Sequence, residues 1–268
     1  MLFNTSLFGN TDKVKMAIEL LRDFEQQAIS INQEGFRLGN SGGKDSGVIV
    51  HLAKMAGVKH TAYYNLTTVD PPELVRHLKQ NHPDTIISRP AISMYHLIIK
   101  KKMPPTRVCR YCCDHLKERG GKNQYIITGI RKGESIRRSK RKIIETCLRD
   151  QSKTYINPII DWSTDEVWEY TRMNNLPYCK LYDEGFTRIG CIGCPMTGKE
   201  KRLMEFKRWP KFERMYRRAF DKAVELRNKN NIKYYGNYRE WKTGSSMFDW
   251  WMSDKHQYQD ENQGLLFE

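Results

Sequence analysis

Apolar positions along the chain alternate between helical and strand-like spacing. Val14, Ile18, Leu21 and Phe24 recur every three or four residues, which predicts an amphipathic helix over 12–31. A short apolar run over 35–39 predicts a strand, and it leads through a Gly- and Ser-rich turn into a helix that stops at Gly57. The same patterns predict strands at 60–66, 85–87 and 125–129, and helices at 70–81, 92–101 and 163–173.

Strands that alternate with helices are typical of an α/β fold, so we expect a parallel sheet with helices on both faces. Beyond residue 175 the pattern changes to a cysteine-containing loop, followed by helices rich in Lys and Arg and a new helix from Pro210. The final apolar segment, 248–252, predicts a helix that packs on the core. We therefore expect an α/β domain with an N-terminal helix over 1–178, and a C-terminal helical, cysteine-containing region over 179–268 packed on it.

Composition narrows the class of protein. The 268 residues include 39% apolar residues, without an apolar run long enough to cross a membrane. The N-terminal residues lack the basic segment and apolar segment of a secretory signal, so we expect a cytoplasmic protein. The formal net charge of +15 predicts an anionic partner such as a nucleotide, sulfate or nucleic acid.

The positive charge is concentrated in three segments. Residues 100–110 carry a net charge of +5, residues 131–142 carry +6 and residues 199–229 carry +7, while the rest of the chain is mildly acidic. The first segment flanks the adjacent cysteines, and the second follows a predicted strand. The third has a helical pattern, and it is the segment that we expect to bind a macromolecular polyanion such as nucleic acid.

The turn Ser41-Gly42-Gly43-Lys44-Asp45-Ser46 has the chemistry of a phosphate-binding loop. Glycines let backbone N–H groups approach an anion, the following helix adds positive potential, and Lys44 and the serine hydroxyls are further donors. Asp45 is suited either to support the loop or to hold Mg²⁺. The spacing from glycine to lysine differs from that of the Walker P-loop.

Two pairs of cysteines suggest a metal site. Cys112 and Cys113 are adjacent, and Cys191 and Cys194 form a C-x-x-C turn; in a reducing compartment such clusters bind metal or do redox chemistry more often than they form disulfides. Four thiolates suit an iron–sulfur cluster or zinc, although adjacent side chains rarely suit one tetrahedral zinc ion. Cys109 also forms a C-x-x-C with Cys112 and is an alternative ligand.

A second anion-binding segment follows the strand at 125–129. Residues at the carboxyl end of a parallel strand face the ligand crevice, where guanidinium groups can bind phosphate or sulfate. The segment carries three arginines, Arg131, Arg137 and Arg138, together with Gly129, Glu134 and Ser135.

These motifs together resemble one family. The loop 41–46 resembles the pyrophosphate-binding loop of the adenine-nucleotide alpha-hydrolase superfamily, which contains the ATP pyrophosphatases and the phosphoadenylyl-sulfate (PAPS) reductases. The segment 129–138 resembles the G-x-R-x-x-E-S-x-x-R segment of the PAPS reductase family, and the adjacent cysteines with the later C-x-x-C resemble the [4Fe–4S] site of adenylyl-sulfate (APS) reductases. The likeness covers roughly residues 36–196.

The resemblance implies a Rossmann-like fold and specific roles for the motif residues. It implies an enzyme that binds ATP, APS or PAPS, with Mg²⁺ as a further candidate, and a [4Fe–4S] cluster with zinc as the alternative. The implied nucleotide-binding residues are Ser41, Gly42, Gly43, Lys44, Asp45, Ser46, Gly129, Arg131, Glu134 and Ser135. The implied catalytic residues are Lys44, Asp45, Arg131 and Arg138, and the implied cluster ligands are Cys112, Cys113, Cys191 and Cys194.

One departure from the family pattern keeps three functions open. APS and PAPS reductases use a cysteine near the C-terminus that attacks the sulfate sulfur, but here no cysteine follows Cys194. The first function is an ATP-dependent enzyme that delivers sulfur to a substrate, with an electron- or sulfur-donor protein as partner. The second is a reductase in which Cys109, Cys147 or Cys179 is the relocated nucleophile. The third is a nucleic-acid-binding module with a regulatory nucleotide pocket.

Overall fold

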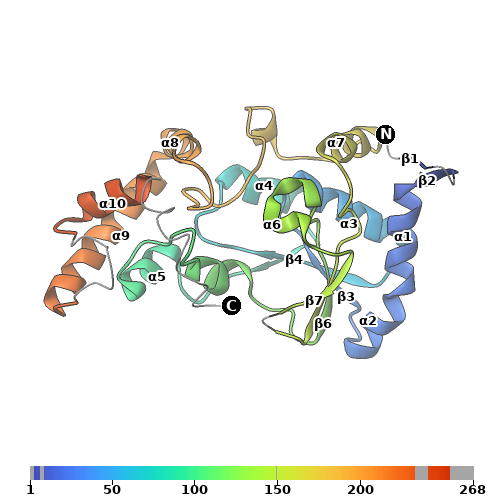
Figure 1. Ribbon diagram of the computed structural model, residues 1–268, viewed down its shortest axis with the longest axis horizontal. Coiled ribbons are helices and arrows are strands. Elements are labelled where there is room, and N and C mark those ends of the chain that lie inside the picture. Colours follow the sequence, from blue (N-terminus) through green and yellow to red (C-terminus); the bar gives the residue numbers. More distant parts are fainter. Residues whose placement is uncertain (1–2, 7–8, 149, 233–240, 254–268) are drawn as a thin grey trace. The chain divides into compact units, whose positions relative to one another are not determined.

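The central sheet has six strands in the part of the chain that the computed structural model describes, residues 3–6, 9–148, 150–232 and 241–253 (Figure 1). Their order is β5-β4-β3-β6-β8-β7. Strand β3 pairs in parallel with β4 and β6, β6 pairs in parallel with β8, and β7 is antiparallel to β8. The bounds are β3 Phe36–Gly39, β4 His60–Asn65, β5 Ile86–Ser88, β6 Gln124–Ile127, β7 Ile144–Thr146 and β8 Lys153–Ile156. The predicted α/β class with a mostly parallel sheet is confirmed.

The chain divides into two compact units, each made of three segments. Unit 1 contains Met1–Tyr64, Pro72–Ser88 and Gly120–Ile189, and unit 2 contains Asn65–Pro71, Arg89–Arg119 and Gly190–Glu268. These units interleave along the sequence, whereas the apolar pattern suggested a single division after residue 178; that division stays a prediction. None of the described helices is both long and apolar enough to cross a membrane.

Unit 1 holds the sheet, a β-hairpin and the helices around the sheet. The hairpin strands are β1 Phe3–Ser6 and β2 Gly9–Asp12, and the helices are α1 Lys13–Asp23, α2 Glu25–Ile31, α3 Lys44–Ala56, α4 Pro72–Asn81, α6 Ile136–Ser139 and α7 Thr164–Met173. Helix α3 packs against α1 and α7, and their apolar faces form one core with the central strands. Ser163 and Glu166 form the predicted capping box at the start of α7.

The helix predicted over 12–31 is in fact two helices. It breaks at Phe24, whose backbone joins α1 to α2 and whose ring packs against Tyr125 of β6, with 6.1 Å between ring centroids. After the break, α2 contacts β3 and β6. The helical periodicity continues across the break, so this turn is decided by contacts with the sheet and not by the local pattern.

Unit 2 is helical around an aromatic core. Its elements are α5 Met94–Lys101, a π-helical turn η1 Cys113–Lys117, α8 Lys199–Arg208, α9 Pro210–Lys229 and α10 Gly244–Met252. The core rings come from α8, α9 and α10 and include Phe206, Tyr216, Phe220, Phe248 and Trp251. Helix α9 begins at Pro210 as predicted. Trp251 is fully buried and its Nε1 donates to the carbonyl of Pro105, so the last helix packs into the core.

Candidate functional site

The predicted phosphate loop joins β3 to α3 in unit 1. Gly42 has a positive φ of 72°, and a Cβ there would lie 2.9 Å from side-chain atoms of Leu74 and Leu78, so glycine is required. Asn40 is buried, and its Oδ1 accepts a hydrogen bond from the Gly42 N–H at 3.0 Å. Ser46 Oγ donates to the Gly43 carbonyl at 2.8 Å. These contacts hold the loop between β3 and α3.

A buried charge cluster lies directly after the loop. Asp45 Oδ2 is 2.8 Å from Lys44 Nζ, and Asp45 Oδ1 is 2.6 Å from Arg131 Nε. The Arg131 guanidinium also donates to the carbonyl of Trp162 and to Thr164 Oγ1 at the start of α7. The side chain of Arg131 is 3% exposed, so its charge is directed into the protein and fixes the Asp45 carboxylate. Thr164 and Trp162 were not identified from the sequence, because nothing local marks them as partners of Arg131.

The second anion-binding segment contacts the loop through its first residues. A Cβ at Gly129 would lie 3.0 Å from the backbone oxygen of Asp45, so glycine allows the two segments to touch. The Arg131 N–H donates to Glu134 Oε2 at 2.9 Å, and Glu134 also forms an ion pair with Arg138. Ser135 caps α6 by accepting from the Arg138 N–H. The predicted residues from the two segments are therefore neighbours, joined through Asp45.

Tyr182 completes the surroundings of the loop and was not predicted. It ends a short 3₁₀ turn, η3 Lys180–Tyr182, and its Oη accepts a hydrogen bond from the Lys44 N–H at 3.0 Å. Its ring makes edge contacts with Trp168 and Tyr178. Burial raises the pKa of Tyr182 to about 12, so the phenol is neutral at physiological pH. Lys44 and Tyr182 are 138 residues apart in the sequence, so no local pattern predicts their contact.

The four predicted cluster ligands all belong to unit 2. Cys112 precedes the π-helical turn η1, and Cys113 begins it; the turn is closed by a hydrogen bond from the Glu118 N–H to the Cys113 carbonyl at 2.8 Å. Single π-helical turns occur frequently at functional sites. The Cys112 and Cys113 thiols are hydrogen-bonded to each other, which raises the pKa of Cys112 and lowers that of Cys113. Cys112 also feels the charges of Cys191 and Cys194.

The C-x-x-C turn is held rigidly by α8 and α9. Gly193 has a φ of 70°, and a Cβ there would lie 2.8 Å from Phe206 and 2.9 Å from Tyr216. Its N–H donates to Glu205 Oε2 at 2.8 Å, and Tyr216 Oη donates to the Ile192 carbonyl at 3.0 Å. Burial raises the pKa of the Cys191 thiol to about 11 and also raises that of Cys194.

The four thiols of unit 2 are the donor set predicted for a metal cluster. Among the described residues no group of three or more His, Cys, Asp or Glu side chains surrounds a common point as metal ligands do. The four thiols nevertheless come from two turns of one unit, and Cys112 interacts electrostatically with the other three. Four sulfur donors are the ligand set of a [4Fe–4S] cluster, so the chemistry of the residues fits this group.

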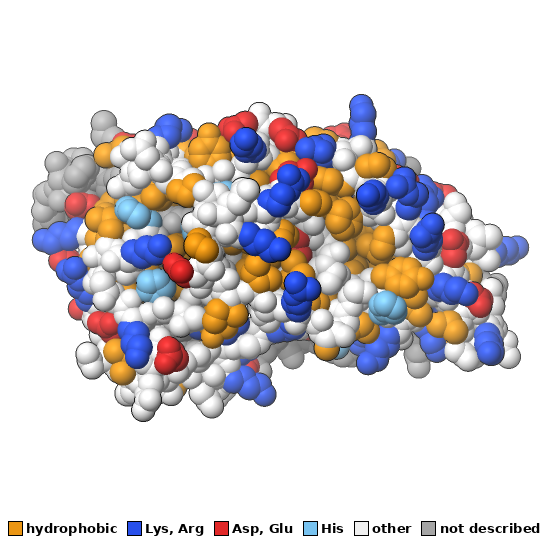
Figure 2. All heavy atoms as spheres, turned by 180° about the vertical axis from the view of Figure 1, so that it is seen from behind, with side chains coloured by type: hydrophobic (Ala, Val, Ile, Leu, Met, Phe, Trp, Pro, Cys, Tyr) orange, Lys and Arg blue, Asp and Glu red, His pale blue; other side chains and the backbone are white. Residues whose placement is uncertain are grey.

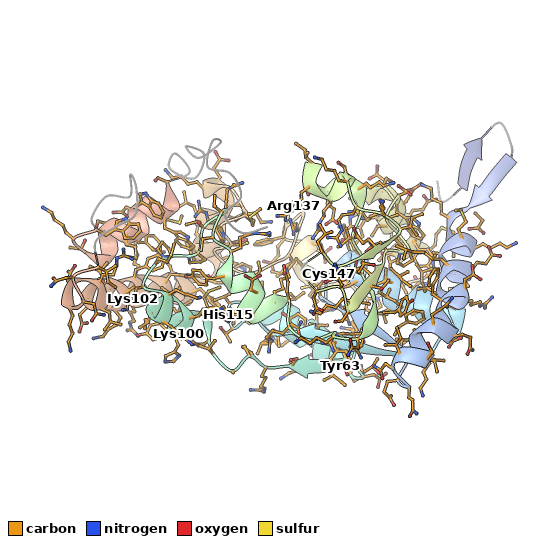
Figure 3. The ribbon with its side chains drawn as sticks, turned by 60° about the horizontal axis from the view of Figure 1, so that its bottom comes forward. Tyr63, Lys100, Lys102, His115, Arg137 and Cys147 are labelled. Carbon is orange, nitrogen blue, oxygen red and sulfur yellow. The ribbon has the colours of Figure 1, made fainter. Side chains whose placement is uncertain are left out.

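The remaining cysteines differ in accessibility. Cys179 is buried, and burial raises the pKa of its thiol, which makes it a weak nucleophile. Cys109 and Cys147 are half-buried. Cys109 belongs to unit 2, and Cys147 lies in unit 1 at the end of β7 (Figure 3).

A family model for the phosphoadenosine phosphosulfate reductase domain matches residues 37–197, which is more than half of the chain. The chain belongs to this family. The match begins in β3 and ends just after Cys194, so it includes the loop, the segment 129–138 and both cysteine pairs. The family predicted from the motifs is therefore confirmed.

The similar proteins of this family include reductases and a protein without a named activity. An adenosine 5'-phosphosulfate reductase of Oceanobacillus iheyensis is 40% identical over 83 residues, which are 31% of this chain and 34% of that protein. An uncharacterised protein of Methanocaldococcus jannaschii is 30% identical over 198 residues, 68% of this chain and 41% of that protein. The matches thus span about a third to two fifths of the length of these relatives.

Two solved structures show a weaker likeness. The PAPS reductase of Candida auris, in a phosphate complex, has a TM-score of 0.48 at 17% identity and covers 70% of this chain and 96% of its own. The FMN adenylyltransferase of Candida glabrata, in complex with ATP, has a TM-score of 0.48 at 16% identity and covers 68% of this chain and 61% of its own. Both TM-scores lie below 0.5, so we assign the fold from the strand order and from the family match.

Proposed function

We propose that the chain is an enzyme that binds an adenine nucleotide, ATP or adenylyl sulfate, on the loop 41–46 and carries out sulfur-transfer or sulfonucleotide chemistry. The observation that carries this proposal is the contact between the loop and the segment 129–138 in unit 1, made through Asp45, Gly129 and Arg131. The family match adds support, because relatives are named as APS and PAPS reductases. The loop supplies N–H donors for phosphate oxygens, and Lys44 supplies a positive charge.

In this proposal the loop residues and the arginines have different roles. Lys44 and the loop N–H groups neutralise negative charge on the group bonded to the α-phosphate. With ATP this group is the departing pyrophosphate. With APS it is the sulfonyl group, which is transferred to a nucleophile. Arg131 acts as a positioning residue, because its guanidinium holds Asp45 and α7. Arg138 is half-exposed and forms an ion pair with Glu134. A phosphate or sulfate of the nucleotide can therefore replace the Glu134 carboxylate as the partner of Arg138.

We propose further that Cys112, Cys113, Cys191 and Cys194 hold a [4Fe–4S] cluster, with zinc as the alternative. Two observations support this proposal: the four thiols belong to one unit, and the turn around Gly193 is held by close contacts and a hydrogen bond. Cys112 interacts electrostatically with Cys113, Cys191 and Cys194, which favours the adjacent pair as ligands. When bound, such a cluster would supply electrons or bind sulfur.

The direct test compares ATP, APS and PAPS with AMP in binding and turnover under anaerobic conditions. We expect the nucleotide that is the substrate to bind more tightly than AMP, because AMP lacks the group that the loop binds. The Lys44→Gln variant should weaken that binding by about tenfold or more, the effect of one charge-assisted contact, while Lys54→Gln, an exposed change on the same helix, should not. Equal binding of AMP and all three larger nucleotides would contradict the proposal.

The products distinguish the two reactions. In the ATP reaction an acceptor attacks the α-phosphorus, the α–β bond breaks, and pyrophosphate leaves with the bonding electrons. In the reductase reaction a cysteine thiolate attacks the sulfur of APS or PAPS, AMP or its 3'-phosphate leaves, and a dithiol donor supplies two electrons to release sulfite. Sulfite production that is lost in Cys109→Ser or Cys147→Ser would support a reductase with a relocated cysteine; Cys179 is too buried for this role.

A second candidate function, binding of nucleic acid, is favoured by the outer face of α9. Exposed cations recur on this face with spacings of three, four and seven residues, opposite the buried side of the helix, and they are Lys211, Arg214, Arg218, Lys222 and Lys229. Lys222 pairs with Glu225, but Lys211, Arg214 and Arg218 have no ion-pair partner among the described residues. The row extends over about 27 Å of helix.

Cations from the first basic segment extend this surface. Helix α5 packs against α9, and Arg227 Nη1 donates to the Lys102 carbonyl. Lys100 and Lys101 at the end of α5 are exposed and belong to the same unit as α9. Figure 3 labels Lys100 and Lys102. Figure 2 shows many Lys and Arg side chains and fewer Asp and Glu side chains on the face that it presents. Two of the three basic segments of the sequence thus meet in unit 2.

Nucleic-acid binding would depend on salt in a predictable way. We expect duplex DNA or RNA to bind with an affinity that falls steeply with salt, and the triple variant Lys211→Gln, Arg214→Gln, Arg218→Gln to reduce the log–log slope by about 2 to 3. Fluorescence anisotropy over a salt series measures both values. The matched control replaces three exposed unit 1 lysines, Lys15, Lys59 and Lys79, and should keep the slope. An unchanged slope in the α9 variant would refute a role for this face.

A further inference from the structure

The phenol of Tyr182 occupies a hydrogen-bonding position that the loop offers to phosphate. Helix α3 begins at Lys44, and its N-cap residue, Gly43, has no side chain to accept the first free N–H groups. The Lys44 N–H instead donates to Tyr182 Oη at 3.0 Å. N–H groups in the first turn of a helix after a glycine-rich loop are the donors that bind phosphate oxygens.

Two further distances place the phenol against the loop. A Cβ at Gly43 would lie 3.2 Å from Tyr182 Oη, so the oxygen sits directly over the loop backbone. Lys44 Nζ lies 5.9 Å from the centroid of the Tyr182 ring. A phosphate oxygen bound by the Lys44 N–H would need the volume that the phenol oxygen now fills.

The segment that carries Tyr182 is held by contacts that can be exchanged. Tyr182 packs edge-on against Trp168, with 5.2 Å between ring centroids, and the turn is closed by backbone hydrogen bonds within 179–186. It belongs to no strand of the sheet, and it ends at Gly185, whose φ of 90° is accessible to glycine. Leu181 anchors the turn in the core, so a displacement would rotate the Tyr182 side chain and not unfold the segment.

We propose that Tyr182 Oη stands in for a phosphate oxygen of the nucleotide and that the nucleotide displaces it from the Lys44 N–H. This inference rests on the proposed nucleotide site. A neutral phenol oxygen is a weaker acceptor than a phosphate oxygen, so the exchange favours the nucleotide. In the free protein the Lys44 N–H therefore has a hydrogen-bond partner. Nucleotide binding is coupled to a movement of the Tyr182 ring away from Trp168 and the loop.

The Tyr182→Phe variant tests the displacement. It removes the competing oxygen and keeps the ring, so we expect ATP and inorganic pyrophosphate to bind about two- to tenfold more tightly, the factor that corresponds to the net contribution of one hydrogen bond. Isothermal titration calorimetry measures both ligands. Tyr178→Phe is the matched control, because Tyr178 lies in the same aromatic cluster but its hydroxyl donates to Asp183. Unchanged or weaker binding in Tyr182→Phe would overturn the inference.

Hydrogen exchange on the wild-type protein separates this inference from the proposed function. With ATP bound, we expect slower exchange in peptides that cover 41–47 and no slowing in 179–186, because the turn keeps its own backbone hydrogen bonds and gains no contact with the loop. ATP binding with slower exchange in both segments would overturn the displacement and leave the nucleotide site intact. If ATP, APS, PAPS and pyrophosphate bind neither to the wild type nor to Tyr182→Phe, both the site and the displacement are wrong. Binding to the variant alone would support the displacement.

Discussion

The Arg131→Met variant is expected to lose about 3 kcal/mol of unfolding free energy, the cost of removing one partner from a buried ion pair. The methionine fills a similar volume, but the Asp45 carboxylate loses a contact of 2.6 Å, and the Trp162 carbonyl and Thr164 hydroxyl lose a donor. Lys44 still pairs with Asp45, which keeps the expected loss at the lower end of the range for buried pairs. Urea unfolding followed by circular dichroism measures the change.

Two further variants make this prediction specific. Lys132→Met is the control, because Lys132 is the next residue and its ion pair with Asp161 is exposed, so we expect a loss of less than about 1 kcal/mol. The double variant Arg131→Met, Asp45→Asn should be more stable than the sum of the two single changes predicts, by about 1 kcal/mol or more, because the two side chains interact directly. An Arg131→Met protein as stable as Lys132→Met would show that the guanidinium does not anchor the loop.

Replacing a proposed cluster ligand is expected to abolish metal binding. Anaerobically purified wild type should be brown, with about four irons per chain, and Cys191→Ser should be nearly colourless, because a serine hydroxyl is a poor substitute for a thiolate ligand to the cluster. Cys112→Ser should behave like Cys191→Ser. Iron analysis and visible absorbance measure the result.

The other cysteines are controls for this prediction. Cys147→Ser should keep its iron, since Cys147 lies in unit 1 and the four proposed ligands lie in unit 2. Cys109→Ser should also keep it, because the adjacent pair Cys112 and Cys113 supplies the two proposed ligands of that turn. A colourless wild type that contains zinc would contradict the iron–sulfur cluster, and loss of iron in Cys109→Ser with retention in Cys113→Ser would move one ligand to Cys109.

Local patterns predicted most of the elements but not the turns that depend on contacts. The periodicity correctly placed α3, its end at Gly57, and the capped start of α7. It did not predict the break at Phe24 or the hairpin of β7 and β8. The first depends on packing of Phe24 against the sheet, and the second consists of two short, partly exposed strands without a continuous apolar face.

The roles of charged residues were harder to predict than their presence. The arginines of the segment 129–138 predict that it binds an anion. In the structure Arg131 points into the protein and holds Asp45, while Arg138 stays at the surface with Glu134. A sequence gives the charge of each side chain, whereas the partner is decided by segments that are distant in the chain, here α3 and the start of α7.

By itself the sequence determined the α/β class, the glycine-rich loop at a strand-to-helix junction and the family, because each depends on neighbouring residues or on a motif with fixed spacing. The tertiary structure decided that Tyr182 covers the Lys44 N–H, that both cysteine pairs belong to one unit, and that the basic segments 100–110 and 199–229 share that unit. All three features bring together residues that are far apart in the sequence, for example Lys44 and Tyr182, which are 138 positions apart. They follow from how the segments pack, which local hydrophobic spacing does not encode.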